Sequence, residues 1–465
     1  MALTAKNTDT SPPYETIVSD IYQQLIERSP RTYRAWQDNF RRFANGVGNR
    51  WGFTHALPMV ASKAKGGRIW DEDGNEFIDC MLSQESLLLG NSPECVVQAL
   101  HDAIDQKGLA FGVVSSQESV LAELIAEHYP SVEKLAFCTT GGEANHCALR
   151  LARAFTGRNK IAKFEGSFHG CLEFFQGGMK YYPNGTPNPI DDPIYTSESA
   201  GMLPAAIDNT VVLPFNHPAA FDKIRRHAGE LAAVIMEPLQ NCSCCPTEID
   251  FMRELRAVTR DAGVLLIFDE VITGFKMTLG GGQGYYGIKP DLTTFGKALG
   301  AGLPLSAVGG RADVIKRMEG RMGPDVVVYG GTHAAHPVVL AGAIAALRYL
   351  AEHPEIYTRI DQFFVQFRDE LNQFCLDNKI KAAVHGYGFM SKLHFVDGDY
   401  HGVREMSRQD PKASEVMALL LRLHGLHTAS GALVILGAET TEADLRRIIE
   451  VHKIALRSLR SYGLV

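Results

Sequence analysis

The sequence has no long apolar run and little excess charge. No stretch of eighteen or more apolar residues occurs, so we expect no helix that spans a membrane. Lys and Arg number 46 against 53 Asp and Glu, which gives a net charge of −7 at pH 7. Such a balance offers no strongly basic surface for nucleic acid or for an anionic membrane. We therefore expect no partner of either class.

Cysteine is scarce, and its spacing does not favour a metal site. The 465 residues include nine cysteines, and residues 1–13 lack the basic flank and apolar core of a secretory signal. An odd count without such a signal is typical of reduced thiols and predicts a cytoplasmic protein. Cys242, Cys244 and Cys245 lie close together, but a zinc site needs a fourth ligand and a spacing such as Cys-x-x-Cys. We predict no metal here and interpret the cluster as a loop.

The middle of the chain alternates predicted strands with helices. With 45% apolar and 21% charged residues, the composition is typical of a globular protein, and the length suits a large domain plus a smaller one. We predict strands at residues 134–139, 160–164, 232–236, 264–268, 292–295 and 305–308. Alternation of this kind predicts an α/β fold whose mostly parallel sheet has helices on both faces.

The two ends of the chain predict a smaller α+β domain. Residues 14–27 and 31–43 have helical patterns, and residues 66–80 indicate a β-hairpin around an Asp-Gly-Asn turn. Helices lengthen after residue 336, with short strands at 392–395 and 433–436. We divide the chain into an N-terminal segment of the small domain (1–90), a large domain (91–335) and the rest of the small domain (336–465).

Asp269 and Lys297 each follow a predicted strand of the large domain. In parallel α/β sheets the carboxyl ends of the strands are where ligands bind. A buried carboxylate and a buried amine at neighbouring strand ends favour a pyridoxal phosphate site, in which a lysine joins the aldehyde and a carboxylate pairs with the ring nitrogen. Glycines at 296, 300 and 302 leave room around the lysine. The alternatives are a buried ion pair and a surface lysine.

Two further segments have features of the same site. The run Thr140-Gly141-Gly142 lies between a strand and a helix start, where free amides and the helix dipole favour a phosphate. Phe168 follows another strand, and its ring could stack on a cofactor. Each segment alone also fits a simpler interpretation, an ordinary strand-to-helix turn for the first and a core residue for the second.

Taken together and in this order, these motifs resemble the class III aminotransferases, which belong to the fold-type I pyridoxal phosphate enzymes. The run Phe-Asp-Glu-Val-Ile-Thr-Gly-Phe at residues 268–275 is very similar to the family's Phe-Asp-Glu-Val-Met-Thr. The resemblance extends over roughly residues 35–455. Within the class, the chain looks most like glutamate-1-semialdehyde aminomutase and β-amino acid aminotransferases such as β-phenylalanine aminotransferase.

The resemblance assigns roles residue by residue. It implies that Lys297 forms the Schiff base, that Asp269 pairs with the pyridinium nitrogen, and that Thr332 reaches the phosphate of a neighbouring subunit in a homodimer. Gly142 stands where relatives carry a hydroxyl residue, which implies that one phosphate contact is lost. The positions implied to contact the cofactor are Thr140, Gly141, Gly142, Phe168, His169, Glu237, Asp269, Val271, Lys297 and Thr332.

The sequence says less about the substrate. Arg50 is a candidate for binding a substrate carboxylate, because a guanidinium can donate two hydrogen bonds to it; the alternative is a surface arginine. Ser83, Gln84 and Glu85 are further candidates for the pocket. The segment 429–432 carries neither the arginine of β-amino acid aminotransferases nor the glutamate of the aminomutase. Residues 180–197 form a Pro/Gly/Asn-rich loop, either a lid or a surface excursion.

We therefore predict a pyridoxal phosphate-dependent aminotransferase. It would move an amino group between a small amine or amino acid, including β-amino acids, and a keto acid or aldehyde. One alternative is an intramolecular aminomutase of the glutamate-1-semialdehyde type, which needs no external acceptor. A second alternative is a pyridoxal phosphate-binding protein without turnover.

Overall fold

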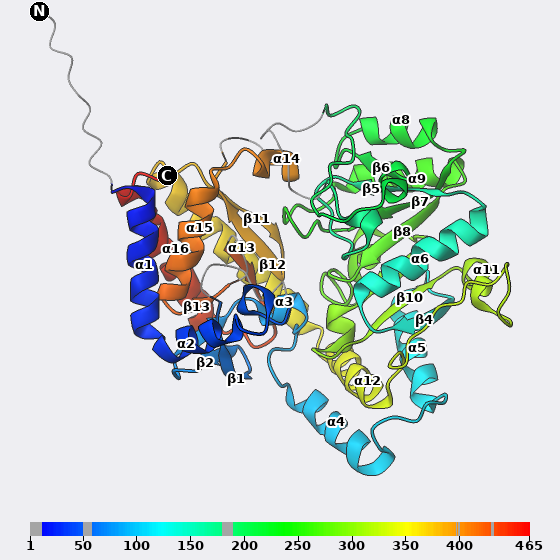
Figure 1. Cartoon of the computed structure of the whole chain (residues 1–465), viewed down its shortest axis with the longest axis horizontal. Coiled ribbons are helices and arrows are strands. Elements are labelled where there is room, and N and C mark those ends of the chain that lie inside the picture. Colours follow the sequence, from blue (N-terminus) through cyan, green and yellow to red (C-terminus); the bar gives the residue numbers. More distant parts are fainter. Residues whose placement is uncertain (1–11, 50–57, 179–188, 397, 399, 429–431) are drawn as a thin grey trace, which may run out of the picture.

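The computed structural model describes residues 12–49, 58–178, 189–396, 398, 400–428 and 432–465, and it contains three β-sheets (Figure 1). The strands are β1 (Ala61–Lys65), β2 (Arg68–Asp71), β3 (Glu76–Asp79), β4 (Lys134–Cys138), β5 (Lys160–Phe164), β6 (Thr210–Leu213), β7 (Leu231–Met236), β8 (Leu265–Glu270), β9 (Leu292–Phe295), β10 (Ser306–Gly310), β11 (Ala383–Tyr387), β12 (Met390–His394), β13 (Leu426–His427) and β14 (Leu433–Ile435).

The described α-helical segments surround these sheets. They are α1 (Tyr14–Arg28), α2 (Pro30–Asn39), α3 (Leu82–Glu85), α4 (Glu94–Lys107), α5 (Ser116–His128), α6 (Gly141–Thr156), α7 (Pro204–Asp208), α8 (Ala219–Arg226), α9 (Ile249–Asp261), α10 (Gly281–Tyr286), α11 (Ala312–Ile315), α12 (Pro337–Glu352), α13 (Glu355–Asp377), α14 (Val403–Met406), α15 (Pro411–Leu423) and α16 (Glu442–Ser461).

The largest sheet has seven strands in the order β4-β10-β9-β8-β7-β5-β6. Its strands from β9 to β6 pair in parallel, and β10 runs antiparallel to both of its neighbours. The predicted α/β fold with a mostly parallel sheet is therefore confirmed. β6 was not predicted, because a four-residue apolar run cannot be distinguished from a helix segment by periodicity.

The central strands form because their sequences are apolar along both faces. All residues of β7 and β8 are buried, as expected for parallel strands covered by helices on each side. Helix α6 packs against β7, β9 and β10, and α9 packs against β8. The carboxyl ends of β8 and β9 consequently lie beside each other, next to the start of α6 (Figure 1).

The two ends of the chain share one structural unit. The four-stranded sheet has the order β1-β2-β3-β13, in which β13 pairs in parallel with β3. Figure 1 shows helix α1 beside α15 and α16, and α1 packs against α15. The β-hairpin predicted around the Asp-Gly-Asn turn is confirmed by the antiparallel pairing of β2 with β3. The domain boundaries at residues 90 and 335 stay a prediction.

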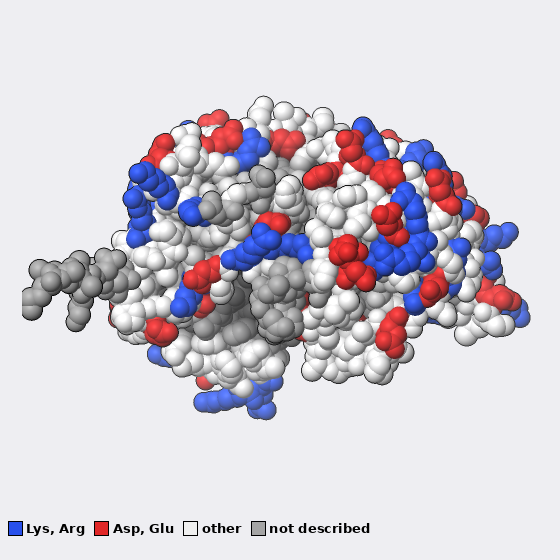
Figure 2. Space-filling view, turned by 90° about the horizontal axis from the view of Figure 1, so that it is seen from above, with Lys and Arg blue, Asp and Glu red and all other residues white. Residues whose placement is uncertain are grey.

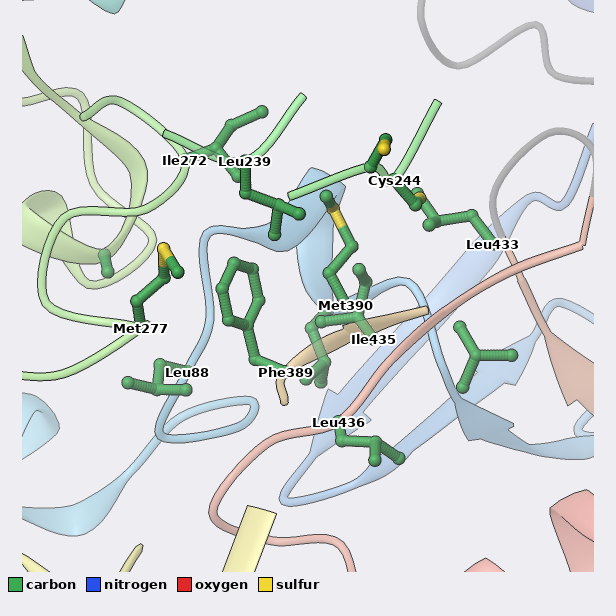
Figure 3. Packing of buried hydrophobic residues seen from close by; sticks show 14 of the residues in the cluster. Leu88, Leu239, Cys244, Ile272, Met277, Phe389, Met390, Leu433, Ile435 and Leu436 are labelled. Carbon is green, nitrogen blue, oxygen red and sulfur yellow. The ribbon is translucent and has the colours of Figure 1, made fainter. Parts of the chain in front are cut away.

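Apolar side chains connect this unit to the seven-stranded sheet. Figure 3 shows Phe389, Met390 and Ile435 of the C-terminal segment gathered with Leu239 and Met277 of the large sheet's loops. All of them belong to one continuous cluster of buried residues. Burial of such side chains contributes about 1.5–3 kcal/mol each, so the two parts are expected to stay in contact.

The surface is mixed in charge. Figure 2 shows Lys and Arg side chains interspersed with Asp and Glu over one face of the molecule. Among the residues that the structure describes, no helix is both long and apolar enough to cross a membrane.

Gly310, the last residue of β10, provides a test of how closely the backbone of the large sheet is packed. A Cβ atom at this position would lie 2.3 Å from the Asp291 carbonyl oxygen and 2.9 Å from the Leu292 Cα atom. We expect Gly310→Ala to lower the free energy of unfolding by about 1–3 kcal/mol, because backbone atoms must move. Urea denaturation followed by circular dichroism measures this loss.

Gly229→Ala is the matched control for that measurement, since a Cβ atom there meets nothing within 4 Å. It should leave the denaturation midpoint nearly unchanged. Equal midpoints for the two variants would contradict the packing described for Gly310.

Candidate functional site

A cavity of about 250 Å³ lies where β8 and β9 end and α6 begins. The start of α6 is more than a hundred residues away in sequence from the ends of β8 and β9, and the parallel sheet brings them together. The cavity is lined by Thr139, Thr140, Gly141, Gly142, Asn145, Phe168, His169, Gly170, Glu237, Asp269, Val271, Ile272, Lys297, Leu303, Pro304 and Leu305.

Asp269 is buried at the end of β8, and its carboxylate accepts hydrogen bonds from four groups, of which Thr294 Oγ1 is the most distant, at 3.5 Å from Oδ1. The amide Nδ2 of Asn145 lies 2.8 Å from Oδ2, the ring Nδ1 of His169 lies 2.7 Å from the same oxygen, and the backbone N–H of Val271 lies 3.0 Å from Oδ1. Asn145 is itself oriented, because its Oδ1 accepts from Thr294 at 2.7 Å. These donors fix the carboxylate at the wall of the cavity.

His169 completes this arrangement as a neutral ring. Burial lowers its pKa below the ordinary value, although Asp269 acts in the opposite direction. A neutral ring that donates from Nδ1 to Asp269 leaves Nε2 as an acceptor, and Nε2 is buried without a hydrogen-bond partner in the described structure. The site therefore contains a buried acceptor beside a fixed anion.

Glu237 is a second buried carboxyl on the cavity wall. Its Oε2 accepts from the Phe168 backbone N–H at 2.9 Å. Burial and the nearby Asp269 hold the pKa of Glu237 well above its ordinary value. Phe168 lines the same cavity.

The start of α6 faces the cavity with free backbone amides. Thr140 caps the helix, with its Oγ1 accepting from the Glu143 N–H at 3.2 Å, and Glu143 in turn accepts from the N–H groups of Thr139 and Thr140. The helix begins at Gly141, so the two glycines lie in its first turn, where amides have no intrahelical partner.

Close packing requires glycine at two positions around this helix start, Gly141 and Gly170. A Cβ atom at Gly141 would lie 2.7 Å from Cγ1 of Val271, and one at Gly170 would lie 2.9 Å from the Gly142 Cα atom. The backbone around the helix start is therefore closely surrounded, and the open side faces the cavity. Such a helix start favours the binding of an anion.

Lys297 follows β9 and points its amine into the same region. Its Nζ forms an ion pair with the carboxylate Oε2 of Glu85. The Lys297 side chain is 22% exposed, whereas that of Glu85 is 4% exposed. The lysine is therefore reachable from the cavity, and its partner carboxylate is not exposed to solvent.

The remaining candidates from the sequence do not meet at the cavity. Ser83 is exposed, and neither Ser83 nor Gln84 is among the lining residues. Thr332 is exposed and also lies outside the lining. Arg50 falls outside the described residues, as do part of the 180–197 loop and most of 429–432. Their substrate and cofactor roles stay predictions.

Sequence reasoning missed Asn145 and Lys276 near the site, and it proposed Glu85 only as a candidate for lining the pocket. Asn145 holds Asp269, Glu85 pairs with Lys297 rather than lining the pocket, and Lys276 donates to the Glu85 carbonyl oxygen at 2.7 Å. Asn145 carried a weak signal, since a polar residue on the apolar side of α6 needs a buried partner. The pairings of Glu85 and Lys276 join distant parts of the chain and left no local signal.

The cysteine cluster shows no metal-binding arrangement. Cys244 and Cys245 are buried, Cys242 is half-buried, and none of the three is joined in a disulfide within the described residues. Within the described ranges, no group of three or more His, Cys, Asp or Glu side chains is positioned to hold a metal ion.

These features fit pyridoxal phosphate. The fixed carboxylate of Asp269 suits a protonated ring nitrogen, the start of α6 suits a phosphate, and the Lys297 amine suits an aldehyde. Phe168 and Val271 supply apolar contacts to the same cavity. The donor and acceptor set therefore matches the three polar parts of that cofactor.

Comparison with known proteins leads to the same family. A model of the family described as aminotransferase class-III matches residues 52–409. A glutamate-1-semialdehyde 2,1-aminomutase of Archaeoglobus fulgidus is 40% identical over 342 residues, which cover 73% of this chain and 78% of that protein. A second aminomutase of this name, from Lachnoclostridium phytofermentans, is 35% identical over 376 residues, covering 80% of this chain and 85% of the relative.

Solved structures agree in fold. An omega-transaminase from Sphaerobacter thermophilus superposes with a TM-score of 0.86 at 29% identity, covering 92% of this chain and 98% of that one. A β-phenylalanine aminotransferase from Variovorax paradoxus gives a TM-score of 0.85 at 27% identity, covering 96% and 98%. The chain thus belongs to the class III aminotransferases, and it is a pyridoxal phosphate-dependent enzyme with the fold of type I transaminases.

Proposed function

We propose that this enzyme is an aminotransferase that uses Lys297 as its reactive amine. It would move an amino group between a small amine or amino acid, including β-amino acids, and a keto acid or aldehyde. The observation that carries the proposal is the joint position of Asp269, Lys297 and the α6 start on one cavity of about 250 Å³. The cofactor, when bound, supplies an electron sink that stabilises charge at the carbon bearing the amino group.

Each residue of the site then has one task. The amine of Lys297 would hold the cofactor by its aldehyde and, when released, would be the base that takes the proton from the substrate carbon. Asp269 would pair with the ring nitrogen, and Asn145 with His169 keeps its carboxylate in place.

The other lining residues bind and orient. The amides at the start of α6 receive the phosphate, with Thr140, Gly141 and Gly142 in this segment. Phe168 and Val271 would hold the cofactor ring, and the buried Glu237 carboxyl lines the same cavity. We further propose a homodimer in which Thr332 serves the site of the second copy, since this exposed residue lies outside its own cavity.

An aminomutase of the glutamate-1-semialdehyde type is the second candidate. It is favoured by relatives of 34–40% identity that carry this name. The same residues would serve both reactions, and the difference is whether an external amino acceptor is needed.

The absorption spectrum of the purified holoenzyme tests the proposal. We expect a yellow band that bleaches with some member of a panel of amines and β-amino acids and returns when a keto acid is added. Isomerisation of a semialdehyde substrate without lasting bleaching would instead support the aminomutase. A protein with no band, even after pyridoxal phosphate is added, would contradict both.

Lys297→Ala should remove the reactive amine. We expect turnover to fall by about 10²–10⁴-fold or more, since acid–base catalysis by a positioned group contributes that much alone. The yellow band of lysine-bound cofactor should disappear as well. Lys289→Ala, at an exposed lysine, is the control and should keep both properties. Full activity of Lys297→Ala would refute the assignment.

Asp269→Asn tests whether the negative charge of Asp269 is needed, because the substitution removes this charge and leaves the size of the side chain nearly unchanged. The asparagine side chain has nearly the same size but lacks the anion, and its NH₂ group would face donors such as Asn145 Nδ2 or the Val271 N–H. We expect the turnover number to fall by about 10²–10³-fold, the range for removing one electrostatic contact in an active site. Stopped-flow bleaching with an amino donor measures it.

Asp261→Asn changes an exposed carboxylate and serves as the control for that measurement. It should leave the bleaching rate unchanged. If Asp269→Asn bleaches as fast as the unmodified enzyme, the proposed role of Asp269 is wrong.

A further inference from the structure

The amine of Lys297 has a partner that the proposed reaction does not use. Its Nζ pairs with the Glu85 carboxylate, whose side chain is only 4% exposed. Burial alone would raise the pKa of the Glu85 carboxyl, but Lys297 and Lys276 hold that pKa below its ordinary value. Glu85 is therefore a buried anion at neutral pH, and such an anion requires a cationic partner.

The backbone that presents Glu85 is strained. The four residues of α3, Leu82, Ser83, Gln84 and Glu85, have φ angles of 44°, 51°, 57° and 63°, which form a left-handed turn. Non-glycine residues adopt this conformation at a cost of about 1–2 kcal/mol each by steric crowding, so strain of this kind persists only where surrounding contacts enforce it and is often found at functional sites.

Hydrogen bonds at both ends of the turn stabilise its left-handed backbone conformation. Before the turn, the Asp79 carboxylate accepts from the N–H groups of Met81 and Leu82 at 3.1 and 2.9 Å, and from Asn91 Nδ2 at 2.8 Å. At its end, the Glu85 carbonyl oxygen accepts from Lys276 at 2.7 Å. The turn is thus anchored, and it places one carboxylate against Lys297.

Lys276 differs from Lys297 in its surroundings. It is 3% exposed, and its Nζ lies 4.6 Å from the centre of the Phe389 ring. Burial, together with the charge of Lys297, holds the pKa of Lys276 well below its ordinary value. Lys276 therefore positions the Glu85 backbone, and the Glu85 side chain has Lys297 as its cationic partner.

We propose that Glu85 is a positioning residue that holds the Lys297 amine, as an ammonium, whenever this amine is not joined to the cofactor. The inference rests on the proposed function, in which Lys297 leaves the cofactor in one half of the reaction and returns in the other. A fixed partner keeps the free amine within the site. The amine must give up a proton and leave Glu85 before it can attack a carbonyl.

Selective acetylation tests the inference on the full-length chain after its cofactor has been removed. The protein is treated with a limiting amount of acetic anhydride at pH 7.5, and mass spectrometry gives the rate at Lys297 relative to the exposed Lys289 of the same molecule. Only a neutral amine reacts. We expect Glu85→Gln to raise the relative rate about tenfold or more, since an adjacent anion favours the charged amine by at least that factor.

Asp444→Asn is the matched control. The Asp444 side chain is 5% exposed and pairs with Arg68, so this variant also removes a buried anion, but outside the lining of the Lys297 cavity. It should leave the Lys297 rate unchanged. Equal Lys297 rates in the unmodified protein and in Glu85→Gln would overturn the proposal.

Glu85→Asp covers the case in which Glu85→Gln fails to fold. It keeps the anion but shortens its reach by one methylene, so acetylation of Lys297 should rise by a smaller factor; an unchanged rate in this folded variant would overturn the proposal. A second readout is the rate at which added pyridoxal phosphate forms the yellow band, which should be faster for Glu85→Gln.

Failure of this inference can be distinguished from failure of the proposed function. Acetylation needs no bound cofactor and reports only on the pairing of Glu85 with Lys297. Normal bleaching by amines together with an unchanged acetylation rate would reject the pairing alone. Absence of any yellow band together with a faster rate in Glu85→Gln would reject the function and leave the pairing supported.

Discussion

The burial of Asp269 is the constraint on which the rest of the site depends. A carboxylate with almost no solvent contact must be surrounded by donors, and here they come from α6, from the segment after β5 and from the backbone after β8. Because these donors must reach the Asp269 carboxylate, the start of α6 lies next to the carboxyl ends of β8 and β9. The same geometry leaves a cavity with an anion on one wall and helix amides on another.

Three buried carboxyls then have different tasks because their neighbours differ. Asp269 has four donors, Glu237 accepts from two backbone N–H groups and lies near Asp269, and Glu85 pairs with the Lys297 amine. Burial and the like charge of Asp269 raise the pKa of Glu237, whereas Lys297 and Lys276 lower the pKa of Glu85. The same functional group thus has a different pKa and a different partner at each of these positions.

Much of the fold could be predicted from local pattern. The central strands are short apolar runs, and their alternation with helices indicated a parallel sheet, as β7, β8 and β9 confirm. Gly141 and Gly142 were expected before the helix and instead lie in its first turn, since the capping box of Thr140 and Glu143 begins the helix earlier. The strand β6 was missed because four apolar residues carry no periodic signal.

The sequence by itself determined the family, the sheet and the motif residues Asp269 and Lys297, because those features depend on residues adjacent in the chain or on motifs of fixed spacing. Only the tertiary structure decided the partners of these residues. Asn145 reaches Asp269 across 124 positions, and Glu85 reaches Lys297 across 212. Pairings of this kind follow from how helices and turns pack on the sheet, and the sum of many distant contacts sets that packing rather than any local pattern.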